Sequence, residues 1–309
     1  MAIYVNTNVS SLNGQRYLTN ANNALNTTYQ RLSSGLRINS AKDDAAGLQI
    51  ADRLTAQING LNQGNRNTND GIALAQTIEG GMDEIHTMLQ SIRTLAVQAA
   101  NGTNTAEDRQ ALEDEANALI SEINRIAQQT TYGGKTILDG GDGAVTSIYT
   151  AADSVGQLVL QVGANSGDKI SFDVSSFKFS HIMNAQSAAT ATAGMNATNA
   201  KLADGTAAMG VGFSTADSAM AVIESMDRAI KQVDTQRSAL GAIQNRLEST
   251  IRNQSNVAVN ESDARSRIQD ADFAEESANL SQQSIIQQAA ASMLMQANTR
   301  PQLGLSLIG

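Results

Sequence analysis

The chain has 309 residues, a formal net charge of −9, no Cys, no Trp and one Pro, and aromatic residues make up 3% of it. This length allows one to three domains, and so few aromatic side chains argue against a large close-packed globular core. Without Cys the chain forms no disulfide and lacks the ligands of most zinc sites. No cluster of Lys and Arg marks a nucleic-acid-binding face.

The sequence contains no apolar run near the roughly 18 residues that a membrane span requires. Residues 1–6 lack a charged region followed by an apolar core, so we expect no cleavable secretory signal. Because Pro301 is the single Pro, every earlier segment is free to form an unbroken helix.

The first predicted element is a helix that extends to about residue 36, where Ser33-Ser34-Gly35 indicates its end. Its apolar residues recur at alternating steps of three and four, namely Leu18, Ala21, Leu25, Tyr29, Leu32 and Leu36. This spacing places them on one narrow stripe. Such a stripe pairs with another helix rather than with a globular core.

A very long helix is predicted next, over about residues 43–99. Ser40 with Asp43 matches a capping box at its start, and this interpretation is favoured over a catalytic or metal-binding pair formed by Asp43 and Asp44. Its seam is the cleanest in the chain and consists of Ile78, Met82, Ile85, Leu89, Ile92, Ala96 and Ala99. Gly80-Gly81 predicts a bend or the close approach of a neighbouring segment.

A third helix follows Asn101-Gly102, with Thr105 and Asp108 as its capping box. Its seam is Leu112, Ala116, Leu119, Ile123 and Ile126. From Tyr132 to about Phe179 the pattern becomes β-like. Residues 158–162 and 170–174 are predicted strands of a hairpin, with residues 163–169 as the loop between them.

Residues 181–213 are rich in Ala, Thr, Gly and Asn, and we expect a loosely packed or irregular surface excursion there. A helix is predicted to start again at Ser214, with Asp217 as its capping partner. Its seam is Ala219, Ile223, Met226, Ile230, Val233, Leu240, Leu247 and Ile251. Arg237 and Gln244 interrupt this seam at positions where coiled coils fix register.

The last predicted helix, over about residues 262–299, carries two apolar stripes. The first is Ala264, Ile268, Ala271, Ala278, Ile285 and Ala289, and the second is Phe273, Leu280 and Leu294 with Ile286 beside them. One stripe can pack within the molecule, so a second stripe predicts a second partner and hence a homo-polymer. The alternative is that one ordinary helical bundle buries both stripes.

Several ordered stretches resemble bacterial flagellins, the subunits of the flagellar filament. They are Arg31-Leu32-Ser33-Ser34-Gly35-Leu36 with its continuation to residue 47, and residues 6–12, 95–103, 161–164, 240–247, 264–274 and 296–302. The resemblance covers about residues 1–180 and 215–309. It implies a mainly α fold, an elongated antiparallel helical bundle or coiled coil built from the N- and C-terminal segments, with small β-hairpins in the middle.

The resemblance also implies a division of the chain. Residues 1–43 with 263–309 pair as an inner terminal-helix domain, and residues 44–180 with 214–262 form a long-helix domain with β-hairpins. Residues 181–213 are the short variable excursion, too short for a large outer domain. The self-assembly seams are predicted to be Leu18, Leu25, Leu32, Leu36, Ile268, Phe273, Leu280, Ile285, Ala289 and Leu294. The long-helix core is predicted to contain Ile78, Met82, Ile85, Leu89, Ile92, Leu119, Ile123, Ile223, Met226, Leu240 and Leu247.

The function that the resemblance implies is assembly into the extracellular flagellar filament, after export of the unfolded chain by the flagellar type III apparatus. The implied partners are other copies of the chain, an export chaperone, the filament cap and the hook–filament junction proteins. A host Toll-like receptor is a further partner, with candidate contacts Gln90, Ser91, Leu95 and Glu115. Receptor-activating flagellins have Arg where this chain has Ser91, which argues against strong activation. Ser and Thr within residues 143–215 are candidates for O-glycosylation.

No cofactor, metal or catalytic residue is predicted. The two histidines, His86 and His181, offer few options for a metal site or an activated nucleophile, so an enzyme is disfavoured. The main alternative is a hook–filament junction adaptor, which shares flagellin-like ends, and a chaperone-like or secreted coiled-coil effector is more distant.

Overall fold

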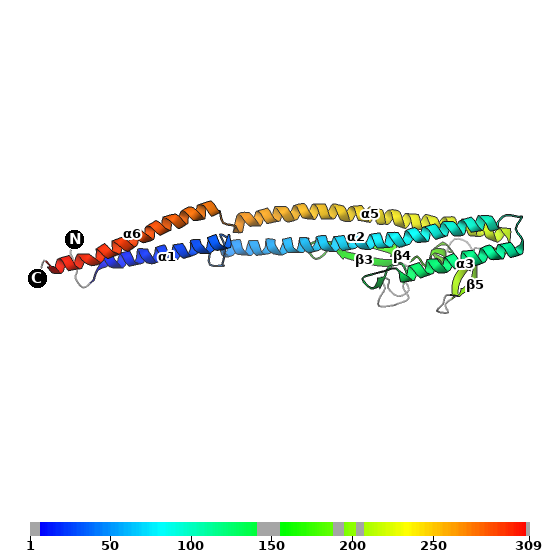
Figure 1. The fold of residues 1–309 in the computed structure, drawn as a ribbon, viewed down its shortest axis with the longest axis horizontal. Coiled ribbons are helices and arrows are strands. Elements are labelled where there is room, and N and C mark those ends of the chain that lie inside the picture. The colour runs from blue at the N-terminus through cyan, green and yellow to red at the C-terminus, as the bar shows by residue number, and fades with distance from the viewer. Residues whose placement is uncertain (1–6, 141–154, 188–194, 202–206, 307–309) are drawn as a thin grey trace. The chain divides into compact units, whose positions relative to one another are not determined.

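The computed structural model describes residues 7–140, 155–187, 195–201 and 207–306 (Figure 1). Its helices are α1 (Val9–Ser34), α2 (Ala45–Ala99), α3 (Ala106–Gln129), α4 (Phe179–Ser187), α5 (Ala216–Gln269) and α6 (Phe273–Ser306). The described strands form antiparallel hairpins: β1 (Thr131–Tyr132) with β2 (Lys135–Thr136), β3 (Val155–Gln161) with β4 (Lys169–Ser175), and β5 (Met195–Lys201) with β6 (Ala207–Val211). The predicted fold class, mainly α with small hairpins in the middle, is confirmed.

The chain divides into two compact units, residues 1–59 with 257–309, and residues 60–256. Both α2 and α5 are continuous through the boundary, so each helix contributes to both units. The boundary therefore differs from the predicted one at residues 43–44 and 262–263. The predicted boundary follows the loop before α2, whereas the first turns of α2 belong with the terminal helices.

The start of α2 differs from the predicted capping box. The Asp43 carboxylate accepts hydrogen bonds from the backbone N–H groups of Asn39 (3.1 Å) and Ser40 (3.0 Å), and so it closes the loop behind it. Asp44 caps the helix instead, because its Oδ1 accepts from the backbone N–H of Gly47 at 2.9 Å. By contrast, the capping box of Thr105 and Asp108 at the start of α3 is confirmed.

The prediction of one final helix from residue 262 is wrong. Residues up to Gln269 belong to α5, and α6 begins at Phe273 after Asp272, whose side chain accepts from the Ala274 N–H at 2.8 Å. The start of α5 also differs from prediction. It is capped by Thr215, whose Oγ1 accepts from the Ser218 N–H at 3.1 Å, rather than by the predicted pair of Ser214 and Asp217.

The main core lies in the second unit, where α2, α3 and α5 pack with the hairpins. Its largest fully buried side chains include Phe177, Phe179, Phe213, Ile78, Met82, Ile85, Leu89, Ile92, Ile120 and Ile123. The predicted surface excursion contributes to this core, because Ile182, Met183 and Val211 are buried along with Phe213. Residues 181–213 therefore differ from the prediction: they hold the end of α4 and the β5–β6 hairpin, and their described ends are anchored.

Glycines on α2 let the β3–β4 hairpin lie directly on the helix backbone. A Cβ added at Gly64 would overlap the carbonyl oxygen of Val162, and one added at Gly60 would lie 2.6 Å from the Cβ of Ala164. The buried Gln254 of α5 donates to that same Val162 carbonyl at 2.5 Å. Further along α2, Gly81 gives close approach to Leu138, as Gly80-Gly81 predicts, and the helix runs on unbroken.

Candidate assembly surface

The terminal helices α1 and α6 lie side by side and antiparallel within the first unit (Figure 1). Hydrogen bonds mark the register from end to end: Ser11 Oγ donates to Asn298 (2.7 Å), and Gln287 Nε2 donates to Asn22 (2.6 Å). On α1 the buried residues are Gly14, Ala21, Leu25 and Thr28. With the half-buried Leu18 between Gly14 and Ala21, these residues recur in steps of four and three, which define a coiled-coil seam.

The α6 side of this seam is a mixture of polar and apolar residues. It consists of Glu276, Leu280, Gln283, Gln287, Ala290, Leu294 and Ala297, which are buried or half-buried in the same three-and-four rhythm. Leu294 packs on Gly14, where an added Cβ would come within 3.3 Å of the leucine side chain. The predicted seam residues Leu18, Leu32 and Leu36 are half-buried. Since glutamines occupy core positions, this helix pair buries little apolar surface on its own.

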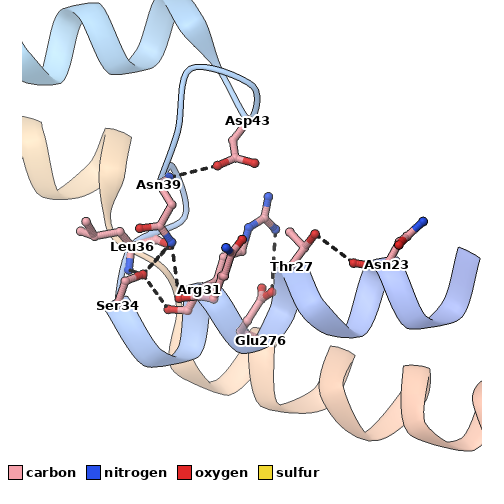
Figure 2. Close-up of polar contacts among 9 residues, drawn as sticks. Asn23, Thr27, Arg31, Ser34, Leu36, Asn39, Asp43 and Glu276 are labelled. Atoms are coloured by element: carbon pink, nitrogen blue, oxygen red, sulfur yellow. Dashed lines mark hydrogen bonds and ion pairs between the residues drawn. The ribbon is translucent and has the colours of Figure 1, made fainter.

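One charged residue lies inside the seam. Figure 2 shows Arg31 of α1 reaching toward Glu276 of α6, with 3.8 Å between Arg31 Nη1 and the carboxylate. The Glu276 side chain is 9% exposed, and Arg31 Nε has no hydrogen-bond partner among the described residues. Polar residues at core positions fix register at a cost in stability, and the cost is greatest for a buried charge. Glu276 was not predicted from the sequence, although it lies four residues before Leu280 in the same rhythm.

The loops at the end of this helix pair are joined to each other. The α1–α2 loop and the α5–α6 loop form a β-bridge at Leu36 and Asp270. Backbone hydrogen bonds flank the bridge, from Arg37 N–H to Gln269 O (2.6 Å) and from Ala271 N–H to Gly35 O (2.9 Å). The two connections of the terminal helices are therefore held as one structural element.

The α1–α2 loop is ordered by its own polar side chains. Asn39 donates to Ser34 Oγ at 2.7 Å, and the loop closes on Asp43, as Figure 2 shows. The pKa of the Asp43 carboxyl is lowered, mainly by the hydrogen bond from the Asn39 backbone and then by those from the Ser40 side chain and backbone. The ionised form of Asp43 therefore stabilises the loop.

A second apolar face of the terminal helices has no partner among the described residues. On α6 this face carries the exposed residues Ile285, Ile286, Ala289 and Met293, whereas Phe273 and Met295 are exposed on the other flank of the seam. On α1 the exposed apolar residues are Val9, Leu12, Tyr17 and Tyr29. The interpretation that one bundle buries both stripes is therefore wrong for the single chain. Of the second predicted stripe, Leu280 and Leu294 face α1, but Phe273 and Ile286 are exposed. Of the first, Ile285 and Ala289 are exposed, and Ile268 belongs to α5.

A groove of about 540 Å³ opens between α1 and α6 on this side. Its lining includes Gly14 and Tyr17 from α1 and Ala290, Met293 and Ala297 from α6. Tyr17 and Met293 are both more than half exposed. The groove is a mostly apolar concave surface suited to receiving side chains from another helix.

The predicted long-helix core lies in the second unit. Ile78, Met82, Ile85, Leu89, Ile92, Ile123, Met226, Leu240 and Leu247 are buried, and Leu119 and Ile223 are half-buried against them. Beside this core a series of polar pairs joins α2 to α5: Glu79 with Gln244 (2.9 Å), Asp83 with Arg237 (3.1 Å), His86 with Asp234 (3.4 Å) and Arg93 with Asp227 (2.5 Å). The α5 numbers fall as the α2 numbers rise, so these pairs mark one antiparallel register.

The candidate receptor contacts lie on α2 and α3. Gln90, Ser91 and Glu115 are exposed and Leu95 is half-buried. The Ser91 hydroxyl donates to the Thr87 carbonyl of its own helix at 3.1 Å. Within the described part of the chain, no group of three or more His, Cys, Asp or Glu side chains is arranged to hold a metal ion, and no helix is long and apolar enough to cross a membrane.

Comparison with known proteins assigns this architecture to a family. The model of the bacterial flagellin N-terminal helical region matches residues 5–142, and that of the bacterial flagellin C-terminal helical region matches residues 223–308. The chain belongs to the bacterial flagellin family. It is 37% identical to polar flagellin C of Vibrio parahaemolyticus over 384 aligned positions, which cover all of both chains. It is 40% identical to a flagellin of Halalkalibacterium halodurans over 304 positions, which cover 98% of this chain and 99% of that one.

A solved structure assigned as a flagellar hook-associated protein of Vibrio parahaemolyticus shares the fold. The TM-score is 0.53 at 14% identity, over 74% of this chain and all of that one. Membership of the flagellin family makes the chain a structural subunit of the extracellular flagellar filament, which forms by self-polymerisation, and not an enzyme.

Proposed function

We propose that this flagellin polymerises through the second apolar face of α1 and α6, and that the groove beside Tyr17 and Met293 receives a helix of a neighbouring subunit. The observation that carries the proposal is the exposure of Ile285, at 66%, on a helix whose other stripe is already paired. Contacts between copies that build a filament are heterologous and do not close on themselves. Each subunit makes several such contacts, and their sum stabilises the polymer although each contact buries little apolar surface.

The test is Ile285→Ser, with Gln282→Ser as its matched control on an exposed polar position of the same helix. Burying an Ile contributes about 1.5–3 kcal/mol, so the critical concentration for polymerisation of the Ile285 variant should rise at least about tenfold. The control should polymerise like the native chain. Sedimentation at a series of concentrations measures both, and equal critical concentrations for the two variants would refute the proposed surface.

We further infer that α1 and α6 are disordered in the free subunit and fold on incorporation. Ordering a residue costs roughly 1–2 kcal/mol, and a seam with glutamines at its core positions offers little apolar burial in return. Limited proteolysis of subunits and of filaments should remove the termini only from subunits. Equal protection of the termini in both forms would contradict this inference.

Export of the unfolded chain through the flagellar type III apparatus is consistent with the disorder inferred for α1 and α6 in the free subunit. We propose that a chaperone holds the apolar stripe of α6 before export, and that the cap and junction proteins receive the subunit outside the cell. Fusion of a stably folded domain to the chain should block its secretion by the flagellated cell. Fusion of a destabilised variant of that domain should not.

The length of the chain supports a subunit without a large outer domain. The alignment with the Vibrio relative extends over 384 positions, more than the 309 residues of this chain, so that relative has residues that are not matched here. The alignment with the Halalkalibacterium relative extends over 304 positions. A thin filament is therefore expected in electron microscopy. O-glycosylation within residues 143–215, much of which lies outside the described residues, is tested by the intact mass of secreted protein.

The hook–filament junction adaptor remains the second candidate, and the shared fold with a hook-associated protein favours keeping it. Purified subunits at high salt distinguish the two, because a flagellin forms long filaments alone and an adaptor does not.

Recognition by a Toll-like receptor is proposed to be weak. Ser91 lies exposed on α2 but offers only a short hydroxyl in the place of an Arg anchor. An Arg at the centre of an interface contributes about 2 kcal/mol or more. A cell reporter assay should therefore show a gain for Ser91→Arg and none for the nearby exposed Thr94→Arg, and no gain for the first variant would sink the inference.

A further inference from the structure

Sulfur chemistry in this chain is confined to ten methionines, because it has no Cys. The core of the second unit encloses several of them: Met82, Met183 and Met226. Three described methionines are more than half exposed, namely Met220 on α5 and Met293 and Met295 on α6. Oxidation of a thioether depends on its exposure, so these three side chains are the most accessible among the methionines whose burial the structure describes.

Two of the exposed methionines flank the α1–α6 seam. Met293 and Met295 lie on either side of Leu294, the residue that packs on Gly14. Successive helix positions are about 100° apart, so these two side chains project away from the seam on opposite sides. Met293 also lines the groove that Tyr17 and Ala290 share.

We propose that Met293 and Met295 form an oxidation-sensitive site that decides whether a free subunit can enter the filament, with hydroperoxides as the class of oxidant. The inference rests on the proposed function, since it requires that both flanks of α6, one with Met293 and the other with Met295, become buried against neighbouring subunits. A subunit is open to the oxidant before incorporation and protected after it.

The reaction is a two-electron oxidation of the thioether. The methionine sulfur attacks one oxygen of hydrogen peroxide, and an S–O bond forms as the O–O bond breaks. The proton on the transferred oxygen passes to the leaving oxygen, which departs as water. The product is a sulfoxide, a polar group on a side chain that was apolar. Burying such an acceptor costs free energy unless a donor meets it. The groove lining includes Ser10, Asn13, Gln296 and Thr299 besides apolar residues, but the added oxygen also enlarges a side chain in a contact that fits a thioether, and overpacking of this kind is destabilising.

A competition between subunits tests the proposal without any substitution. Native subunits are oxidised with hydrogen peroxide to less than one sulfoxide per chain, mixed with filament seeds, and separated into pellet and supernatant. Peptide mass spectrometry then measures the sulfoxide at each methionine. Sulfoxide at Met293 and Met295 should be depleted about tenfold from the pellet. Equal distribution between pellet and supernatant overturns the proposal.

Leucine variants provide the second arm. The double variant Met293→Leu with Met295→Leu keeps the apolar volume and should elongate seeds equally well before and after peroxide. The control Met220→Leu should lose elongation on oxidation, as the native chain does. Equal loss in the double variant and the control overturns the proposal.

Preformed filaments treated with the same peroxide should oxidise more slowly at Met293 and Met295 than subunits do, and equal rates count against the proposal. If unoxidised subunits fail to polymerise at all, the proposed function is at fault. If they polymerise and exclude no sulfoxide, only this inference fails.

Discussion

At the scale of single residues, glycines decide where the β3–β4 hairpin can lie. Gly64→Ala places a methyl group against the Val162 carbonyl, and the hairpin must shift or detach. Overpacking of this kind costs about 1–3 kcal/mol. The matched control is Gly80→Ala on the same helix, where an added Cβ meets nothing within 4 Å among the described residues.

Because Ala favours helix over Gly by about 0.8–1 kcal/mol, the control should be as stable as the native chain or more so. Urea unfolding followed by circular dichroism measures the difference between the variants. A Gly64 variant as stable as the Gly80 variant would show that the hairpin does not press on α2.

A carboxylate gives the second prediction at this scale. The pKa of Asp108 is lowered from its ordinary value of 3.8, first by the hydrogen bond from the Thr105 side chain and then by that from its backbone. A lowered pKa in the folded state means that the cap contributes fully above the unfolded value and is lost as pH falls through the folded one. The start of α3 should therefore fray only below about pH 3.8.

Amide chemical shifts of Thr105 and Asp108, measured by NMR from pH 5 downward in steps of about half a unit, follow this transition. Asp108→Asn removes the titrating group, so the amide chemical shift of Thr105 in this variant should not change with pH. If the chemical shifts of the native chain change with a midpoint above pH 3.8, the ordinary pKa of Asp, the prediction is contradicted.

At the scale of elements, the polar pairs between α2 and α5 involve residues that the sequence marks as interruptions of an apolar seam. Arg237 and Gln244 interrupt an apolar seam, and both reach across to α2. Their predicted role in fixing the register of the two helices stays a prediction. Exposed ion pairs of this kind contribute only about 0–1 kcal/mol each. Their combined effect is to select one alignment of two long helices that apolar contacts alone leave free to slide.

Other elements were harder to predict for physical reasons. The rhythm of Ala264, Ile268 and Ala271 continues across the break between α5 and α6, so periodicity predicts one helix where capping by Asp272 starts another. The apolar residues of 181–213 show little periodicity, because the segment packs against the core through a few buried side chains such as Phe213 rather than through a continuous stripe. The two predicted stripes of the last helix were only partly right, because Phe273 and Ile286 of the second are exposed and Ile268 of the first belongs to α5. The residues that face α1 depend in part on Gly14, which has no apolar side chain.

The buried Glu276 gives a prediction for the α1–α6 pair. The double variant Arg31→Leu with Glu276→Leu replaces the charged pair of the seam as a whole and leaves no unpaired charge behind, and a replacement of this kind is neutral or stabilising by about 1–4 kcal/mol. In assembled filaments, amide hydrogen exchange along α6 should slow for this variant. The exposed neighbour Glu275→Leu is the control and should leave exchange unchanged. Faster exchange in the double variant would mean that the ion pair of Arg31 and Glu276 stabilises the packing of α6 on α1, beyond fixing the register of the two helices.

At the scale of the whole molecule, each subunit brings a net charge of −9 to a polymer of identical copies. Like charges repel, and salt screens them over about 30 Å at 0.01 M but 8 Å at 0.15 M. The critical concentration for polymerisation should therefore fall as salt rises across this range. Sedimentation measures it, with sucrose at matched osmolality as the uncharged control, and an unchanged critical concentration would show that charge does not limit assembly.

The β-bridge between the two loops has a mechanical consequence. A filament that drives swimming bears load, and load on either terminal helix reaches the rest of its subunit through a loop. With Leu36 and Asp270 bridged, force applied to α1 or to α6 is shared by both connections at once. The flanking backbone hydrogen bonds would have to break together before either loop could extend alone. The joint is thus expected to resist pulling more than a single strand of chain would.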